Sequence, residues 1–299
     1  MPSLKRPEGA EPEDFHLSRR VVAASFFLGY AAAALAADAE PIHTDDAGLI
    51  VEGVSYPSSG FALPAYVARP KAPGRHPAVI VVNEIFGVHD YIKDVCRRLA
   101  KLGYVAIAPA FFVRVADPAP LTDMAAIMKI VSQASDAQVM GDVGATLRYL
   151  RASSFVDATR IAITGFCWGG GVVWLACEQF PELKAGVAWY GRMAPTPGAA
   201  PVPGRMWPIQ GVDHLTAPVL GLYGAKDALA AQIPAMRAAL AAAHKDSTEI
   251  VVYPDAGHGF HADYRESYVE ADAKDGWARM LAHFRKNGVG PRPYVRSPG

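Results

Sequence analysis

The chain has 299 residues, of which 51% are hydrophobic and 19% charged, and its formal net charge at pH 7 is zero. This composition suits a chain with a large buried core, and the length allows one large domain with an N-terminal extension or two small domains. The neutral charge balance gives no support for binding to nucleic acid or to an anionic membrane surface.

Residues 1–39 have the order of regions that is typical of an export signal. A polar stretch ends in two arginines at 19–20, an apolar run covers 21–37, and A-x-A sequences at 34–36 and 37–39 offer cleavage sites. The long polar lead and the paired arginines predict a twin-arginine signal, and hence a periplasmic protein with no membrane span after cleavage. A retained membrane anchor is the alternative, because the apolar run is close to the roughly 17-residue lower limit for spanning a bilayer.

Beyond residue 45, strand-like and helix-like patterns alternate without a domain boundary. Two extended runs around a turn at 57–60 predict an opening β-hairpin, and later apolar, β-branched runs predict buried strands. The predicted strands cover 50–56, 61–69, 78–82, 104–108, 160–164, 185–190, 218–223 and 249–253. The predicted helices cover 92–102, 136–151, 168–179, 232–243 and 268–286. This alternation predicts an α/β fold, with a mostly parallel central sheet and helices on both faces, in one domain over residues 40–299.

A nucleophile motif lies between the strand at 160–164 and the helix at 168–179. Residues 165–169 read G-F-C-W-G, which has the G-x-nucleophile-x-G spacing with Cys167 where serine is usual. The sharp turn places the thiol at a helix N-terminus, where backbone dipoles stabilise a thiolate. A glycine-rich turn with a buried cysteine is the alternative. A phosphate-binding loop is disfavoured, because no Gly-Lys-Ser/Thr ending follows.

The three cysteines do not form a disulfide framework. Cys167 and Cys177 are ten residues apart, which along a helix corresponds to ~15 Å. A disulfide needs Cα atoms within roughly 7 Å, so these two residues do not pair. Cys96 lies in a helix-like segment and is interpreted as a small buried hydrophobic residue.

The base and the acid of a catalytic triad follow the nucleophile in the order that this motif requires. Asp227 comes just after the strand at 218–223, and His258 just after the strand at 249–253. We predict that His258 is the base and that Asp227 orients it.

Other acidic and histidine residues compete for these roles. Asp213 and His214 precede a strand and belong at the wrong edge of the sheet, and Asp255 lies in the histidine loop itself, where it can shape the turn. His261 is interpreted as structural. A metal pair of His258 and His261 is disfavoured, because flanking glycines argue against a helix and further clustered ligands are not evident. We therefore predict no metal site.

At this point the sequence resembles the dienelactone hydrolase family, also called carboxymethylenebutenolidases, over about residues 45–288. The resemblance depends on three motifs: N-E-I-F-G at 83–87, G-F-C-W-G-G at 165–170 and A-G-H-G-F at 256–260. It implies an α/β-hydrolase fold and a triad of Cys167, His258 and Asp227.

The same resemblance implies roles for the loop after the strand at 78–82. Glu84 would meet the resting thiol and take its proton when substrate binds, and a buried glutamate at this position would need such a partner. The alternative is a solvated loop glutamate. The backbone N–H groups of Ile85 and Trp168 would form the oxyanion hole.

The substrate-binding residues of the family match this sequence less completely than the catalytic residues do. Family members that act on dienelactone bind its carboxylate with two arginines, and one of them matches Arg114, which is otherwise a surface residue. The second would fall on Ala262, whereas Arg265 is nearby in a different register. This departure leaves the exact lactone open.

We expect hydrolysis of a lactone or activated carboxylic ester, dienelactone-like and anionic by the resemblance, through a cysteine acyl-enzyme. This chemistry requires no metal or organic cofactor. A general carboxylesterase or thioesterase without dienelactone preference is one alternative. A secreted binding protein without turnover on the same fold is the other.

Overall fold

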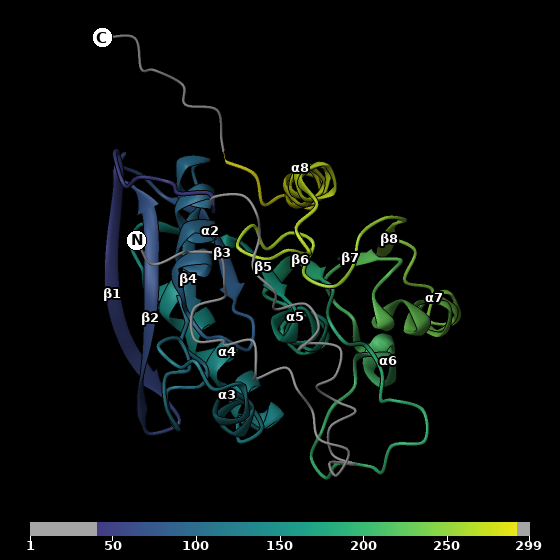
Figure 1. The fold of residues 1–299 in the computed structure, drawn as a ribbon. Coiled ribbons are helices and arrows are strands. Elements are labelled where there is room, and N and C mark those ends of the chain that lie inside the picture. Colours follow the sequence, from purple (N-terminus) through teal and green to yellow (C-terminus); the bar gives the residue numbers. More distant parts are fainter. Residues whose placement is uncertain (1–40, 292–299) are drawn as a thin grey trace.

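The structure of the protein is a computed structural model, which describes residues 41–291. The predicted export signal at 1–39 lies outside these residues. One eight-stranded sheet forms the centre, in the order β1-β2-β4-β3-β5-β6-β7-β8 (Figure 1). The strands are β1 Leu49–Ser58, β2 Phe61–Pro70, β3 His76–Val82, β4 Val105–Pro109, β5 Val156–Phe166, β6 Leu183–Trp189, β7 Val219–Gly224 and β8 Glu249–Tyr253.

Helices cover both faces of this sheet, with α2 and α8 on one face and α4 and α5 on the other (Figure 1). The α-helices are α2 Asp90–Lys101, α3 Met124–Val131, α4 Asp136–Ala152, α5 Trp168–Gln179, α6 Pro208–Gly211, α7 Ile233–Ala242 and α8 Glu270–Lys286. Two short 3-10 helices are η3 Val212–His214 and η4 Ala228–Gln232. No helix within residues 41–291 has both the length and the apolar character needed to cross a bilayer.

The pairing of the strands confirms the predicted fold class. The β1–β2 and β2–β4 pairs are antiparallel, and the remaining pairs along the sheet are parallel. Strands β4 and β7 are buried along their whole length, and β3 is buried from its second residue on. Their runs of Val, Ile, Leu and Ala form strands because helices exclude water from both sides of the sheet.

Helix α3 was not among the predicted elements. It begins after Asp123, whose side chain accepts a hydrogen bond from the backbone N–H of Ala125 at 2.9 Å. Met124, Ile127, Ile130 and Val131 are buried, with the three- and four-residue spacing of one helix face. Its eight residues are too few for a clear periodic pattern in the sequence, so packing against the core decides its conformation.

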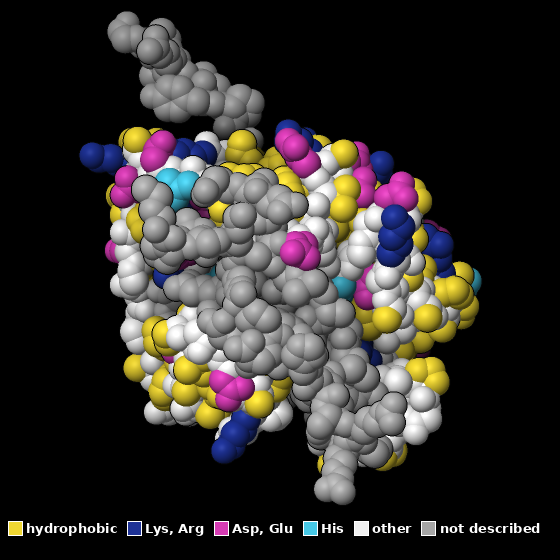
Figure 2. Space-filling view, in the orientation of Figure 1, with side chains coloured by type: hydrophobic (Ala, Val, Ile, Leu, Met, Phe, Trp, Pro, Cys, Tyr) yellow, Lys and Arg dark blue, Asp and Glu magenta, His cyan; other side chains and the backbone are white. Residues whose placement is uncertain are grey.

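The parallel arrangement brings distant motifs to one edge of the sheet. Glu84 follows β3, Cys167 follows β5, Asp227 follows β7 and His258 follows β8. The carboxyl ends of parallel strands meet at the same edge, which is where open α/β sheets place their sites. On the face shown in Figure 2, the coloured charged side chains of both signs are interspersed, in agreement with the neutral composition.

Candidate active site

Cys167 occupies a strained turn between β5 and α5. Its φ is 57° and its ψ is −116°, a region that costs a residue with a side chain about 1–3 kcal/mol. The flanking glycines allow this turn, because a Cβ on Gly165 would lie 2.4 Å from the carbonyl oxygen of Gly169. The backbone N–H of Cys167 donates to the carbonyl of Trp189 at 3.0 Å. The predicted nucleophile is therefore fixed by its neighbours in a rare conformation.

The structure brings the three predicted triad residues together. Asp227 Oδ2 lies 2.7 Å from Nδ1 of His258, and Asp227 Oδ1 accepts a hydrogen bond from the backbone N–H of Leu229 at 2.9 Å. A side-chain hydrogen bond joins His258 to Cys167. All three triad side chains are buried. Thiol, imidazole and carboxylate thus form one chain of contacts at the carboxyl edge of the sheet.

The charges around His258 favour its protonated form. Burial alone would lower the pKa of the imidazole, but the charges of Asp227 and Cys167 and the hydrogen bonds to both residues raise it to about 10. At neutral pH the ring is therefore an imidazolium beside a sulfur that can carry the balancing negative charge.

The competing residues lie elsewhere. Asp255 is exposed and lies 3.1 Å from Nζ of Lys226, and η3, which contains Asp213 and His214, precedes β7 and so belongs to the opposite edge. His261 is buried with its Nδ1 2.6 Å from the hydroxyl of Tyr91.

Aromatic rings surround His261, with ring centroids 4.4 Å from Trp189, 5.2 Å from Phe166 and 5.7 Å from Trp277. Burial lowers the pKa of this imidazole well below its ordinary value. These contacts are those of a neutral core residue, as the sequence interpretation assumed.

Glu84 is fully buried within a cluster of donors. Its Oε1 lies 3.0 Å from Nη2 of Arg265, while its Oε2 accepts a hydrogen bond from the hydroxyl of Tyr264 and lies 3.4 Å from Nε2 of His89. Burial raises the pKa of this carboxyl, but Arg265, His89 and Tyr264 outweigh it and lower the pKa to about 2. Glu84 is therefore an anion at any pH at which the protein works.

The loop after β3 and the start of α5 approach within backbone contact. A Cβ on Gly169 would lie 2.6 Å from the carbonyl oxygens of both Val82 and Asn83. This approach brings residue 85 and residue 168, the predicted oxyanion-hole positions, onto adjoining segments. Two backbone N–H groups from such segments are what an oxyanion hole on this fold uses.

Residues 63–288 match the model described as the "Dienelactone hydrolase family". The chain belongs to this family. It is therefore an enzyme of a hydrolase family that acts on lactone and ester bonds of small molecules. The resemblance inferred from the three motifs is confirmed.

Relatives match most of the chain. A Methylorubrum extorquens protein named "Putative carboxymethylenebutenolidase" is 47% identical over 278 residues, which cover 91% of this chain and 94% of the relative. The crystal structure of a "Putative Dienelactone Hydrolase" from Klebsiella pneumoniae has a TM-score of 0.74 at 50% identity, and covers 80% of this chain and 99% of its own. A Bradyrhizobium protein named "Probable 2-oxo-3-(5-oxofuran-2-ylidene)propanoate lactonase" is 34% identical over 248 residues, or 82% and 97% of the two chains.

The arginine that matches the carboxylate-binding arginine of dienelactone hydrolases has structural partners here. The Nη2 of Arg114 donates to a carboxylate oxygen of Asp142 and, at 3.1 Å, to the carbonyl of Ser58, while its guanidinium lies 4.5 Å from the ring centroid of Phe61. These partners belong to the β1–β2 hairpin and to α4. The structure thus places Arg114 in a packing contact between elements, and Arg265 in the ion pair with Glu84.

Sequence reasoning missed three site residues of this dienelactone hydrolase family member. Tyr264 and His89 hold Glu84, and Tyr190, after β6, packs its ring edge on His258 with centroids 5.0 Å apart. For His89 and Tyr264 the available signal was their position just after family motifs, since His89 follows the 83–87 motif by two residues and Tyr264 follows the 256–260 motif by four.

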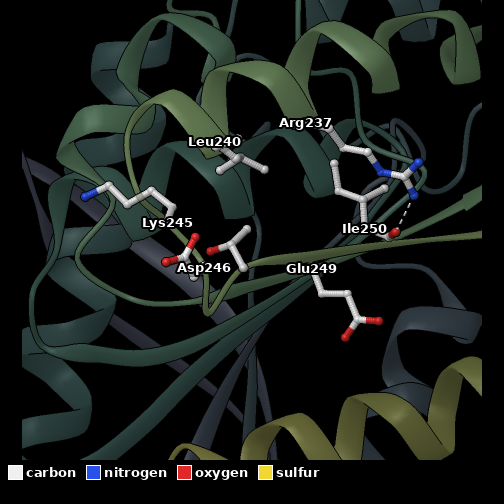
Figure 3. Close-up of a pocket in the computed structure, with 8 residues that line it drawn as sticks. Arg237, Leu240, Lys245, Asp246, Glu249 and Ile250 are labelled. Carbon is white, nitrogen blue, oxygen red and sulfur yellow. Dashed lines mark hydrogen bonds between the residues drawn. The ribbon is translucent and has the colours of Figure 1, made fainter.

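A hollow on the surface lies at the opposite edge from the triad. Figure 3 shows Arg237, Leu240, Lys245, Asp246, Glu249 and Ile250 around it, with the guanidinium of Arg237 donating to the carbonyl of Ile250 at 2.7 Å. Because Glu249 begins β8, the hollow is at the amino end of that strand. It takes no part in the candidate site.

Proposed function

We propose that this protein hydrolyses a lactone or an activated carboxylic ester through a covalent thioester on Cys167. The observation that supports this most directly is the contact chain from Cys167 through His258 to Asp227 on a strained turn. A thiolate beside an imidazolium is both nucleophile and acid, so one site can attack a carbonyl and protonate the leaving group.

In the first half-reaction, the sulfur attacks the carbonyl carbon and a C–S bond forms. The C–O bond of the ester or lactone breaks, and the imidazolium of His258 gives its proton to the departing alkoxide or enolate. The backbone N–H groups of Ile85 and Trp168 stabilise the oxyanion between these steps. The role of Asp227 is to hold the imidazole in the required orientation.

In the second half-reaction, neutral His258 takes a proton from water, and the resulting hydroxide attacks the thioester carbon. The C–S bond breaks and the sulfur leaves as a thiolate, again beside an imidazolium. The product is a carboxylic acid, which ionises in solution. Atoms and charges therefore balance over the cycle without any metal or organic cofactor.

The proposal assigns Glu84 a conditional role. The family resemblance makes Glu84 the acceptor of the thiol proton, but that role needs a protonated resting thiol, whereas the cycle above starts from a thiolate beside an imidazolium. In this cycle Glu84 is instead an anion held by three donors, one of which a bound substrate can draw away. Of the three, Arg265 is the cation that an anionic substrate would attract most strongly.

The proposed substrate class is a lactone that bears a carboxylate. The name of the Bradyrhizobium relative supports it, because that lactone carries a 2-oxo acid group. Ala262, which stands where the second arginine would be, favours the alternative of a broader carboxylesterase or thioesterase. Arg114 would recognise the carboxylate only by leaving Asp142, so Arg114→Ala should raise the KM for an anionic lactone and not for a neutral aryl ester.

The test of the proposed function is a substrate panel with wild type and Cys167→Ala. We expect wild type to hydrolyse dienelactone faster than aryl acetates or thioesters, and Cys167→Ala to lose roughly 10⁴-fold in kcat on each. The matched control is Cys177→Ala on the same helix. Equal rates for wild type and Cys167→Ala would refute the proposed nucleophile.

We also propose that residues 1–39 direct export. In a host with a twin-arginine pathway, we expect the mature protein in the periplasm with its N-terminus after Ala36 or Ala39. Replacing both Arg19 and Arg20 with Lys should retain the precursor in the cytoplasm. Unchanged export of that variant would contradict the twin-arginine route, and an uncleaved membrane-bound form would favour the anchor.

A further inference from the structure

Tyr190 has a strained backbone directly beside the nucleophile turn. Its φ is 40°, in the left-handed region that costs a residue with a side chain about 1–3 kcal/mol. Its backbone N–H donates to Leu222 at 2.8 Å, and the carbonyl of the preceding Trp189 accepts the N–H of Cys167 at 3.0 Å. Tyr190 and Cys167 are therefore fixed to each other through one peptide unit, and both have unusual backbone angles.

The Tyr190 hydroxyl is buried without a well-formed hydrogen bond. The side chain has no exposed surface, and no atom of residues 41–291 has the distance and angles of an ordinary hydrogen bond to its oxygen. The hydroxyl of Tyr91, from α2, acts on it as a weak hydrogen-bond partner and also lies 2.6 Å from Nδ1 of His261. An unsatisfied buried hydroxyl costs about 1–3 kcal/mol. Tyr190 thus combines a strained backbone with a buried hydroxyl that lacks a good acceptor, and this combination indicates a functional role for the residue.

The ring of Tyr190 lies against the imidazole of His258, close to the charged groups of the site. Its edge packs on the imidazole of His258 at 5.0 Å, and the charges of Glu84, Arg265 and Cys167 all act on its hydroxyl. Burial raises the pKa of Tyr190 well above its ordinary value, and Glu84 adds to this effect. The hydroxyl therefore keeps its proton and can only be a neutral donor or acceptor.

Of the two acceptors near this hydroxyl, Glu84 and the Cys167 sulfur, the sulfur is the one with fewer donors around it. Glu84 is already held by Arg265, Tyr264 and His89. The contact that the structure gives the Cys167 side chain is with His258, at a position with no exposed surface. A buried anion needs more than one hydrogen bond, whereas a neutral thiol accepts hydrogen bonds weakly. The Tyr190 hydroxyl can therefore supply the hydrogen bond that a negatively charged Cys167 sulfur would need.

We propose that Tyr190 is a further catalytic residue whose hydroxyl donates a hydrogen bond to the sulfur of Cys167 when that sulfur is a thiolate. The proposal deepens the proposed function and depends on it, because only a nucleophilic sulfur needs this donor. The proton stays on the phenol oxygen throughout. The hydrogen bond forms as negative charge gathers on sulfur and is lost as the C–S bond forms.

The test compares Tyr190→Phe with Tyr104→Phe. Both substitutions remove a buried hydroxyl that makes no ordinary hydrogen bond within residues 41–291, but Tyr104 precedes β4 at the opposite edge of the sheet. We would measure alkylation by iodoacetamide at pH 6, the ultraviolet absorbance of thiolate against a Cys167→Ala baseline, kcat on an aryl ester and the melting temperature.

We expect Tyr190→Phe to slow alkylation and kcat by roughly 10- to 100-fold, the usual worth of a hydrogen bond to a charged group, and to lose thiolate absorbance. Its melting temperature should stay equal or rise, because an unsatisfied group is gone. Tyr104→Phe should keep wild-type alkylation and kcat.

Two results would overturn the inference. One is a folded Tyr190→Phe whose alkylation, absorbance and kcat stay within about twofold of wild type, given the far larger effect expected of a lost charge-assisted bond. The other is a Tyr190→Phe that unfolds, since the hydroxyl would then have a structural partner. Cys167→Ala in the same experiment separates the two proposals. If Cys167→Ala is inactive while Tyr190→Phe behaves like wild type, only the role of Tyr190 is refuted. If Cys167→Ala is active, the proposed nucleophile is refuted.

Discussion

Two buried arginine–carboxylate pairs in this protein have the same chemistry and different surroundings. Glu84 pairs with Arg265 and accepts from Tyr264, while Asp142 pairs with Arg114 and accepts from the hydroxyl of Ser58 at 2.5 Å. Both carboxylates are fully buried. The first pair lies at the carboxyl edge of the sheet beside the triad, whereas the second joins the β1–β2 hairpin to α4.

The difference indicates that the position of a buried ion pair in the fold decides whether a substrate bound at the triad can reach it. The partners of Glu84 come from the loops that also supply Cys167 and His258 with neighbours, so a substrate can compete for them. The contacts of Asp142 join the β1–β2 hairpin to α4. A 2.7 Å contact between the hydroxyls of Tyr56 and Thr146 joins the same elements. Residue type alone would not have distinguished them.

The largest expected effect is on stability, from Asp142→Asn. Removing one charge of a buried pair leaves Arg114 uncompensated, which costs about 3 kcal/mol of unfolding free energy. We expect urea denaturation to show this loss while kcat per folded molecule stays at the wild-type value. A loss of kcat without a loss of stability would mean that the hairpin pair belongs to the site.

Glu84→Gln should show the reverse pattern. The variant keeps the shape of the side chain but removes the anion that holds Arg265 beside the triad. We expect kcat to fall by roughly 100-fold, the lower range for the loss of one electrostatic contact in an active site. Steady-state kinetics on an anionic lactone would measure it, with Asp142→Asn as the matched control. Wild-type kcat in Glu84→Gln would make this glutamate structural as well.

The pH dependence of activity sharpens the comparison further. The leaving group needs the imidazolium of His258, whose pKa is raised to about 10, so kcat/KM should fall about tenfold per pH unit above that value. Asp227 is the largest contributor to the raised pKa. Asp227→Asn should therefore move the alkaline limb to lower pH, besides lowering kcat. A limb near pH 6.5 in wild type would contradict the imidazolium–thiolate description.

The smallest expected effect concerns Glu178, a half-buried carboxyl on α5. Burial raises its pKa from 4.5 to about 8, so its proton stays bound in the folded protein over a range in which the unfolded chain releases it. Wild-type stability should fall as pH rises from 4.5 to 8. Glu178→Gln should remove about 1–2 kcal/mol of that dependence, after allowance for partial exposure. Parallel stability–pH curves for both proteins would contradict the raised pKa.

Much of the fold was predictable from local patterns. The apolar run at 78–82 and the alternation of strands and helices gave the parallel sheet, because buried central strands need nothing but apolar, β-branched residues. Cys167, Asp227 and His258 were predictable as a set, because chain order and strand ends constrain all three positions.

The partners of the buried charges were not predictable. Tyr264 is 180 residues from Glu84 in sequence, and Asp142 is 28 residues from Arg114. Such contacts leave no periodic pattern, since each depends on how two distant loops pack. The segment around Arg114 gives no sign of its contact with Asp142, and Tyr190 looked like the end of a strand because backbone strain cannot be read from sequence.

The central claim is that Cys167 forms a covalent bond with the acyl group. The most direct measurement is intact-protein mass spectrometry of enzyme quenched in acid during turnover of an activated aryl ester, chosen so that acylation is faster than hydrolysis of the thioester. We predict a mass increase equal to the acyl group, located on the peptide that contains Cys167 and absent from Cys167→Ala. Steady turnover with no acylated protein, or with the acyl group on another residue, would contradict the account.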